Sequence, residues 1–256
     1  MAILSIALNT FRETVRDKVL YNILLFAVGF AVVSIIVSQW SLGQQDKILK
    51  DFGLTIVTVF SLVISIFIGT SLIYKEVEKR TVYSILSKPI SRAEFVLGKY
   101  FGLALTMFIS FIMMSAGLLL IIWLFTNGFH PKLLIQLGFI FLTMTIIIAI
   151  ALLLSTFVSP IVSSILTLFV FIGGNFSADI RVLGVDPATE GTVIEWIINL
   201  GYYLMPNLQL LNFHTEVVHN MPLDINRIIV GLIYTVLYNG VIILLAVWIF
   251  NKKNIK

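Results

Sequence analysis

Six long apolar runs dominate the pattern of hydrophobic and polar positions along this chain. A helix needs about 20 apolar residues to cross the roughly 30 Å hydrocarbon core of a bilayer. The runs that come near this length are residues 20–40, 54–74, 101–125, 133–155, 161–178 and 228–250. The pattern therefore predicts an all-α membrane protein with six transmembrane helices, which form a single domain over residues 1–256.

The most polar segment, residues 75–100, lies between the second and third runs and holds nine charged side chains. Lys88 precedes Pro89, and a residue before proline is pushed out of the helical region, so a first helix is expected to end just before this pair. Ser91 and Glu94 have the S-x-x-E spacing of a capping box, which begins a second helix that continues into the third run. We interpret the segment as a docking element for a protein partner. A solvated loop that only holds the topology is the open alternative.

Lys and Arg residues divide unequally between the two sides that six spans create. The side with both termini and residues 75–100 holds 12 of the 17, and the opposite side holds five. The positive-inside rule therefore predicts that both termini and residues 75–100 lie in the cytoplasm. The formal net charge of +4 is then a signal of membrane orientation, and we do not expect nucleic-acid binding.

The residues before the first run, 2–18, have the pattern of an amphipathic helix. Apolar side chains recur there at helical spacing, at Leu4, Leu8, Phe11 and Val15. Arg12 and Arg16 lie on other faces of that helix. We expect a helix in the cytoplasmic interface, with Phe11, Arg12 and Arg16 as its candidate interfacial residues. An ordinary charged lead-in to the first span is the open alternative.

The longest segment on the outer side, residues 179–227, contains an apolar stretch that is too short to span a membrane. This stretch, VIEWIINLGYYLM, carries Trp196, Tyr202 and Tyr203, and such side chains favour the membrane–water interface. We therefore expect an external re-entrant or interfacial helix before the sixth span, ended by Pro206.

The chemistry of the six runs excludes several classes of membrane protein. The chain is 59% hydrophobic and 12% charged, and no run contains Asp, Glu, Lys, Arg or His. Transporters driven by protons or sodium usually carry such side chains within their spans, so we expect the driving force to come from another protein. The sequence has no P-loop either, because its only Gly-Lys pair, Gly98-Lys99, is followed by Tyr100 where Ser or Thr is needed. The chain is therefore not expected to be an enzyme or to hold a nucleotide itself.

Metal binding has one candidate in the sequence. The chain has no cysteine, which excludes thiolate ligands. His214, Glu216 and His219 are three potential zinc or copper ligands on the outer side. Their spacing is not that of HExxH, and we prefer to interpret them as a surface cluster without metal.

Four segments carry a resemblance to a known family. They are ALNTFRETVRDKVLYN, IYKEVEKRTVYSILSKPISRAEFVLGKY, YYLMPNLQLLNF and IFNKKNIK, and they are spread over nearly the whole length. The chain resembles the permease subunits of type-2 ATP-binding-cassette (ABC) exporters, in the multicopper-enzyme maturation branch of the nitrous-oxide-reductase type. The second segment is the most specific, because an acidic–basic cluster followed by Pro, Ser-Arg and Gly-Lys is the usual cytoplasmic loop of this family.

The resemblance implies a permease that pairs with a second copy or a paralogue and sits on two copies of an ABC ATPase subunit. ATP hydrolysis in that subunit would be coupled to export or mechanical work through a coupling helix between the second and third spans. Carried onto this sequence, the docking residues are Glu76, Glu78, Lys79, Arg80, Thr81 and Tyr83, with Pro89, Ser91 and Arg92 closing the turn. Arg80 departs from the family pattern, in which glycine is common at this position.

The same resemblance implies the cofactors, partners and location. The chain itself is expected to bind no cofactor, because ATP and Mg belong to the ATPase partner. The expected location is the cytoplasmic membrane, with the lipid bilayer and an external partner protein as further contacts. A non-transporting scaffold or receptor-like subunit of a complex is the alternative function, and reconstituted vesicles would separate the two because a scaffold moves nothing.

Overall fold

The computed structural model describes residues 2–39, 44–78, 91–126, 128, 130–177 and 205–252. Within these ranges the chain is helical and has no β-strand. The long helices are α1 (Ala2–Val15), α2 (Lys18–Gln39), α3 (Gln45–Glu78), α5 (Arg92–Thr126), α6 (Pro131–Ser155), α7 (Pro160–Asn175) and α11 (Ile225–Lys252). A 3-10 turn, η1 (Gln209–Leu211), and a short helix, α10 (His214–Val218), lie between α7 and α11. The predicted all-α class is confirmed for the described residues.

Each predicted apolar run falls on one of these helices, although the bounds differ. By length and composition α3, α5, α6 and α11 are sufficient to cross a membrane, whereas the apolar parts of α2 and α7 are shorter. The second run was expected to begin at residue 54, but its helix begins at Gln45. The external helix expected around residues 193–204 lies outside the described residues.

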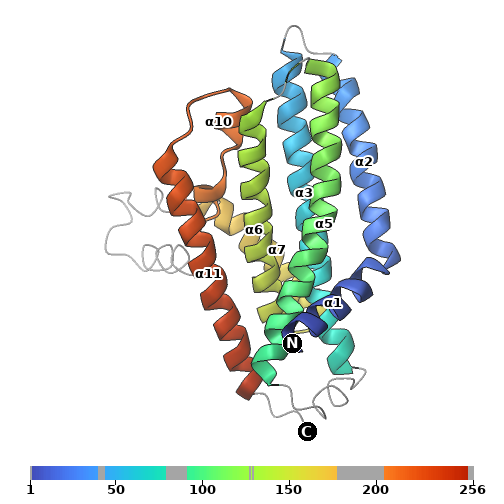
Figure 1. Cartoon of the computed structure of the whole chain (residues 1–256), viewed down its shortest axis with the longest axis vertical. Helices are drawn as coiled ribbons and strands as arrows, with labels where there is room; N and C mark the ends of the chain where they lie inside the picture. Colours follow the sequence, from blue (N-terminus) through green and yellow to red (C-terminus); the bar gives the residue numbers. More distant parts are fainter. Residues whose placement is uncertain are drawn as a thin grey trace, which may run out of the picture.

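The centre of the bundle is α6, which packs against α3, α5, α7 and α11 (Figure 1). Its residues Ile146, Ile147 and Ile148 have no exposed surface, as expected for a helix that is apolar on every face. α3 comes close to it at Gly69, where an added Cβ would lie 2.6 Å from the Cβ of Ala151. Small residues at such contacts let membrane helices approach one another closely.

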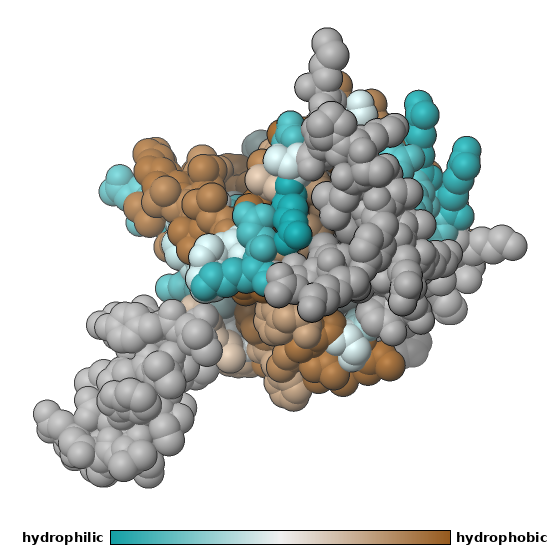
Figure 2. All heavy atoms as spheres, turned by 90° about the horizontal axis from the view of Figure 1, so that it is seen from below, coloured by the Kyte–Doolittle hydropathy of each residue, from teal (hydrophilic) through white to brown (hydrophobic). Residues whose placement is uncertain are grey.

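Large apolar side chains cover the outward faces of α7 and α11. Ile161 and Phe169 on α7 are 74% and 63% exposed, and Val236 and Leu244 on α11 are 71% and 70% exposed. Apolar faces of this extent mark contact with a membrane or with another protein. In Figure 2, seen from one end, hydrophobic surface occupies two parts of the outline, and hydrophilic surface lies between them and at other parts of the edge.

A buried polar cluster joins α5, α6 and α11 inside the bundle. The Tyr100 hydroxyl donates to the side-chain oxygen of Asn239 at 3.1 Å. The Asn239 amide nitrogen donates in turn to the Thr145 hydroxyl, also at 3.1 Å. Side-chain hydrogen bonds between membrane helices contribute about 0.6 kcal/mol on average. The cluster therefore matters more for the register of the three helices than for stability.

Residues 205–224, here called the strap, lead into α11 at the end of the bundle opposite to α1 (Figure 1). Arg227, in the first turn of α11, holds the strap in place. Its guanidinium donates to three strap carbonyls, those of Gln209, Leu210 and Asn212, at 2.7, 3.2 and 2.6 Å. The same group pairs with the Glu216 carboxylate at 2.5 Å and lies 4.5 Å from the centroid of the Phe213 ring.

The first part of the strap, residues 205–213, packs against α6 and α11. The backbone N–H of Asn207 donates to the Tyr234 hydroxyl at 2.8 Å. Tyr234 lies nine residues after the start of α11, which is about 14 Å along the helix axis. The N–H of Phe213 donates to the side-chain oxygen of Gln136 at 2.8 Å. Irregular backbone within a membrane domain is tolerated only when it is buried in protein or lines a cavity, and here α6 and α11 supply side-chain partners for it.

Candidate functional site

The start of α5 is closed by a reciprocal cap. The backbone N–H and the hydroxyl of Ser91 donate to the Glu94 carboxylate at 2.9 and 3.0 Å. The backbone N–H of Glu94 donates back to the Ser91 hydroxyl oxygen at 3.2 Å. The capping box predicted from the S-x-x-E spacing is therefore confirmed, and it fixes the point at which the polar segment becomes helix.

Arg92 connects the start of α5 to the end of α11. Its guanidinium donates to the carbonyls of Phe250 and Asn251, each at 3.0 Å. The last carbonyls of a helix have no partner within that helix and carry partial negative charge, so a guanidinium is a favourable partner for them. The rings of Phe95 and Phe250 stack beside this contact, with centroids 5.6 Å apart. The start of α5 and the end of α11 are therefore held together by hydrogen bonds and ring stacking.

Replacing Arg92 with alanine is expected to loosen the last turns of α11. Hydrogen bonds from charged groups contribute about 1.5–3 kcal/mol, and the substitution removes two of them. Hydrogen–deuterium exchange of the last turns of α11, around Phe250, should rise in Arg92→Ala. Arg12→Ala, an exposed arginine on α1, is the matched control and should leave that exchange unchanged. Equal protection in both variants would contradict the role assigned to Arg92.

The N-terminal helix α1 is seated on α5 by two glycines. A Cβ added to Gly98 would lie 2.7 Å from the Cβ of Ile6, and one added to Gly102 would lie 2.6 Å from the carbonyl oxygen of Ala7. Thr10 is fully buried at this contact. Side chains larger than hydrogen do not fit at either glycine, so the two helices touch along their backbones.

The predicted interfacial residues lie on the other sides of α1. Phe11 is half-buried, and Arg12 and Arg16 are exposed. Leu4 and Leu8 are 66% and 41% exposed, so part of the apolar stripe points away from the rest of the described chain. An apolar stripe next to exposed arginines is the pattern of a helix that lies in a membrane interface.

The polar segment enters the interior soon after α5 begins. Lys99, which sequence analysis grouped with the other charges of residues 75–100, is only 1% exposed. Its ammonium lies 5.8 Å from the centroid of the Phe95 ring, within the distance of a cation–π contact. Side chains of α5 are therefore buried in the bundle from the end of its first turn onward.

Four of the nine predicted docking residues belong to the described part of the chain. Ser91 and Arg92 lie at the start of α5, and Glu76 and Glu78 belong to the last turn of α3. The remaining ones, Lys79, Arg80, Thr81, Tyr83 and Pro89, lie outside the described residues. The end of α3, the start of α5, the helix α1 and the end of α11 meet at one end of the bundle (Figure 1). The docking segment therefore begins and ends at this end.

The three candidate metal ligands do not converge on one point. The Nε2 atom of His214 contacts the Asp51 carboxylate of α3 at 2.6 Å, and Glu216 pairs with Arg227. His219 is exposed. In the part of the chain that the structure covers, no three His, Cys, Asp or Glu side chains gather as metal ligands do. Sequence reasoning missed both pairings. His214 and Asp51 are 163 positions apart, and Glu216 and Arg227, 11 positions apart, meet only because the strap turns into α11.

The third histidine, His130, lies between α5 and α6. Burial lowers its pKa below the ordinary value, and the nearby Lys50 ammonium lowers it further.

Comparison with known proteins places the chain in a family. No curated protein matches it. A family model described as "ABC-2 family transporter protein" matches residues 4–255, which is nearly the whole chain. The chain is therefore a transmembrane permease of the ABC transporter class and belongs to the ABC-2 family.

Proposed function

We propose that this permease works with a separate ATPase subunit and that residues 75–92 dock on that subunit. The observation that carries the proposal is the junction at the start of α5. Arg92 ties α5 to the end of α11, and the two glycines seat α1 on the same helix. A displacement of the docking segment would therefore reach three helices at once, which suits the transmission of ATP-driven motion into a membrane domain.

The proposed assembly follows the family. Two ATPase copies hold ATP and Mg, and two permeases, identical or paralogous, form the path through the cytoplasmic membrane. In this proposal α2, α3, α5, α6, α7 and α11 are the six spans, with both termini in the cytoplasm. The excess of Lys and Arg on the α1 side supports this orientation. The work done is export or mechanical transmission across the membrane.

Within the family we propose the multicopper-enzyme maturation branch, on the loop residues quoted above. Membership of that branch does not make copper the cargo of this chain. Two of the three candidate ligands, His214 and Glu216, are engaged with Asp51 and Arg227. The cargo is therefore better sought through the binding surfaces of the bundle than through a metal site.

The test is a pull-down of the tagged chain in mild detergent, with identification of the proteins that co-purify and an ATPase assay on the eluate. We expect a stoichiometric partner with a P-loop, together with ATP turnover. A pure membrane protein without a P-loop partner or turnover would overturn the proposal and favour the non-transporting scaffold.

A further inference from the structure

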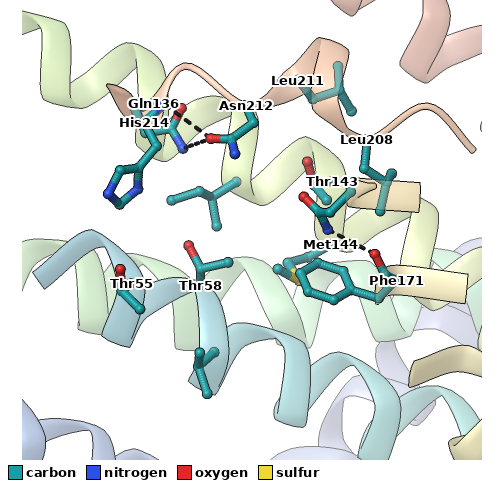
Figure 3. Close-up of a pocket in the computed structure, with 13 residues that line it drawn as sticks. Thr55, Thr58, Gln136, Thr143, Met144, Phe171, Leu208, Leu211, Asn212 and His214 are labelled. Atoms are coloured by element: carbon teal, nitrogen blue, oxygen red, sulfur yellow. Dashed lines mark hydrogen bonds between the residues drawn. The ribbon is translucent and has the colours of Figure 1, made fainter. Parts of the chain in front are cut away.

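A pocket lies between α3, α6, α7 and the strap (Figure 3), with a volume of about 130 Å³. Its uncharged polar side chains are Thr55 and Thr58 of α3, Gln136 and Thr143 of α6, Asn175 of α7 and Asn212 of the strap. Apolar side chains, among them Met144 and Phe171, complete the walls. A concave, largely apolar surface with a few converging polar groups is the usual composition of a ligand site.

Two of these side chains keep an acceptor for a ligand. The Thr58 hydroxyl donates to the Leu54 carbonyl at 2.8 Å, and the Asn175 amide nitrogen donates to the Phe171 carbonyl at 2.9 Å. These bonds use donors and leave both side-chain oxygens, which accept hydrogen bonds. The pocket therefore offers acceptor oxygens from α3 and from α7.

A donor comes from the strap. The side-chain oxygen of Asn212 accepts from the backbone N–H of His214 at 3.1 Å and from the Gln136 amide at 3.5 Å (Figure 3). With the oxygen engaged in this way, the carboxamide is oriented and its NH₂ group remains a donor. A matching ligand carries both donors and acceptors, as hydroxyl and carboxamide groups do.

The pocket selects against charge. The side chains that the structure places around it include no Asp, Glu, Lys or Arg. Its histidine, His214, is engaged with Asp51. A charged ligand would find no free counter-charge, and burying an unpaired charge costs far more than burying a neutral polar group.

The volume limits the size of the ligand. An engineered cavity of about 150 Å³ holds one benzene molecule, which has about six heavy atoms. We propose that this pocket binds an uncharged group of that size bearing hydroxyls or a carboxamide. The inference goes beyond the proposed function and does not depend on it, because it rests on the geometry of this chain alone.

The chain has no cysteine, so a single introduced thiol reports on the pocket. Thr55→Cys, an exposed position of the pocket lining to which no ligand contact is assigned, is placed in the full chain and purified in detergent. Its rate of modification by methyl methanethiosulfonate is followed by mass spectrometry. The probes are glycerol, acetamide and acetate, of which the last two have nearly the same shape and differ in charge. Lys47→Cys, exposed on the same helix, is the control, and Thr143→Cys is a second reporter in case the first variant does not fold.

We expect glycerol and acetamide to slow modification of the pocket thiol by about tenfold when they stand at about ten times their Kd. Acetate should have no such effect, and the control thiol should react at an unchanged rate. Asn175→Leu should abolish the protection. The proposal is overturned if neither neutral probe protects, if acetate protects equally, or if the control thiol is slowed alike. Because no ATPase is present, these outcomes are independent of the pull-down.

Discussion

Reversing the charges at Glu76, Glu78, Lys79 and Arg80 is expected to uncouple the permease from its ATPase. Changing the two acids to Lys and the two bases to Glu leaves the net charge and the Lys and Arg count of the segment unchanged, so the chain should still insert. Opposite charges that meet across the proposed interface would become like charges, whose juxtaposition costs several kcal/mol. Stimulation of the ATPase on assembly should fall to the level of the ATPase alone.

The measurement is ATP turnover by the ATPase with and without the purified permease in vesicles. The matched control is Asp46→Lys together with Lys47→Glu, an exposed pair at the other end of α3. This control reverses charge on the same helix and should leave stimulation intact. Full stimulation by the variant with the reversed segment would refute docking through these four residues.

Gly102→Leu is expected to detach α1 from α5. An added Cβ would lie 2.6 Å from both the carbonyl oxygen of Ala7 and the Cβ of Thr10. A backbone carbonyl cannot yield as the end of a flexible side chain can, and leucine brings three further carbons into the same space. Overpacking of a tight contact costs about 1–3 kcal/mol, so α1 should leave its seat or the whole chain should lose that stability.

Hydrogen–deuterium exchange of α1 and the melting midpoint in detergent together measure this effect. Gly117→Leu on the same helix is the control, because nothing lies within 4 Å of a Cβ added there. We expect faster exchange in α1, a lower midpoint, or both, for Gly102→Leu alone. Identical behaviour of the two variants would show that the close contact of α1 and α5 does not exist.

Local signals in the sequence predicted the start of α5 correctly. A capping box is a contact between residues three apart, so Ser91 and Glu94 are sufficient to specify it. The bounds of α3 were harder to predict, because a count of apolar residues stops where charges begin. The helix extends beyond the apolar run and includes Asp46, Lys47 and Lys50. A charged residue outside the hydrocarbon can still be part of the helix.

The seat of α1 could not be read from its apolar pattern. The residues that face the glycines of α5 include Ala7 and Thr10, both buried, whereas Leu4 and Leu8 are exposed. The glycines of α5 bring the two backbones so close that only small side chains fit at the contact with Gly102. This restriction depends on the positions of both helices, so the sequence of α1 alone does not reveal it.

The strap shows the same limit at longer range. Its sequence indicated a histidine cluster, but its position depends on Arg227, which binds backbone carbonyls that carry no sequence signature. The pocket polar groups come from three helices and the strap, so no spacing along the chain could have grouped them.

The length of α3 has a mechanical consequence. It is a single helix of 34 residues, or about 51 Å. Glu76 and Glu78 lie at one end, Asp51 lies near the other, and Thr58 of the pocket wall lies between them. A rod of this length that tilts about its middle by about 10° moves its two ends by about 4 Å in opposite directions.

A push on the proposed docking end of α3 would therefore swing Asp51 toward or away from His214 without bending the helix. The contact between these two side chains joins α3 to the strap beside the pocket. In this arrangement the proposed docking end and the pocket wall belong to the same helix, so a tilt at the docking end would change the gap between α3 and the strap at the other end of the helix.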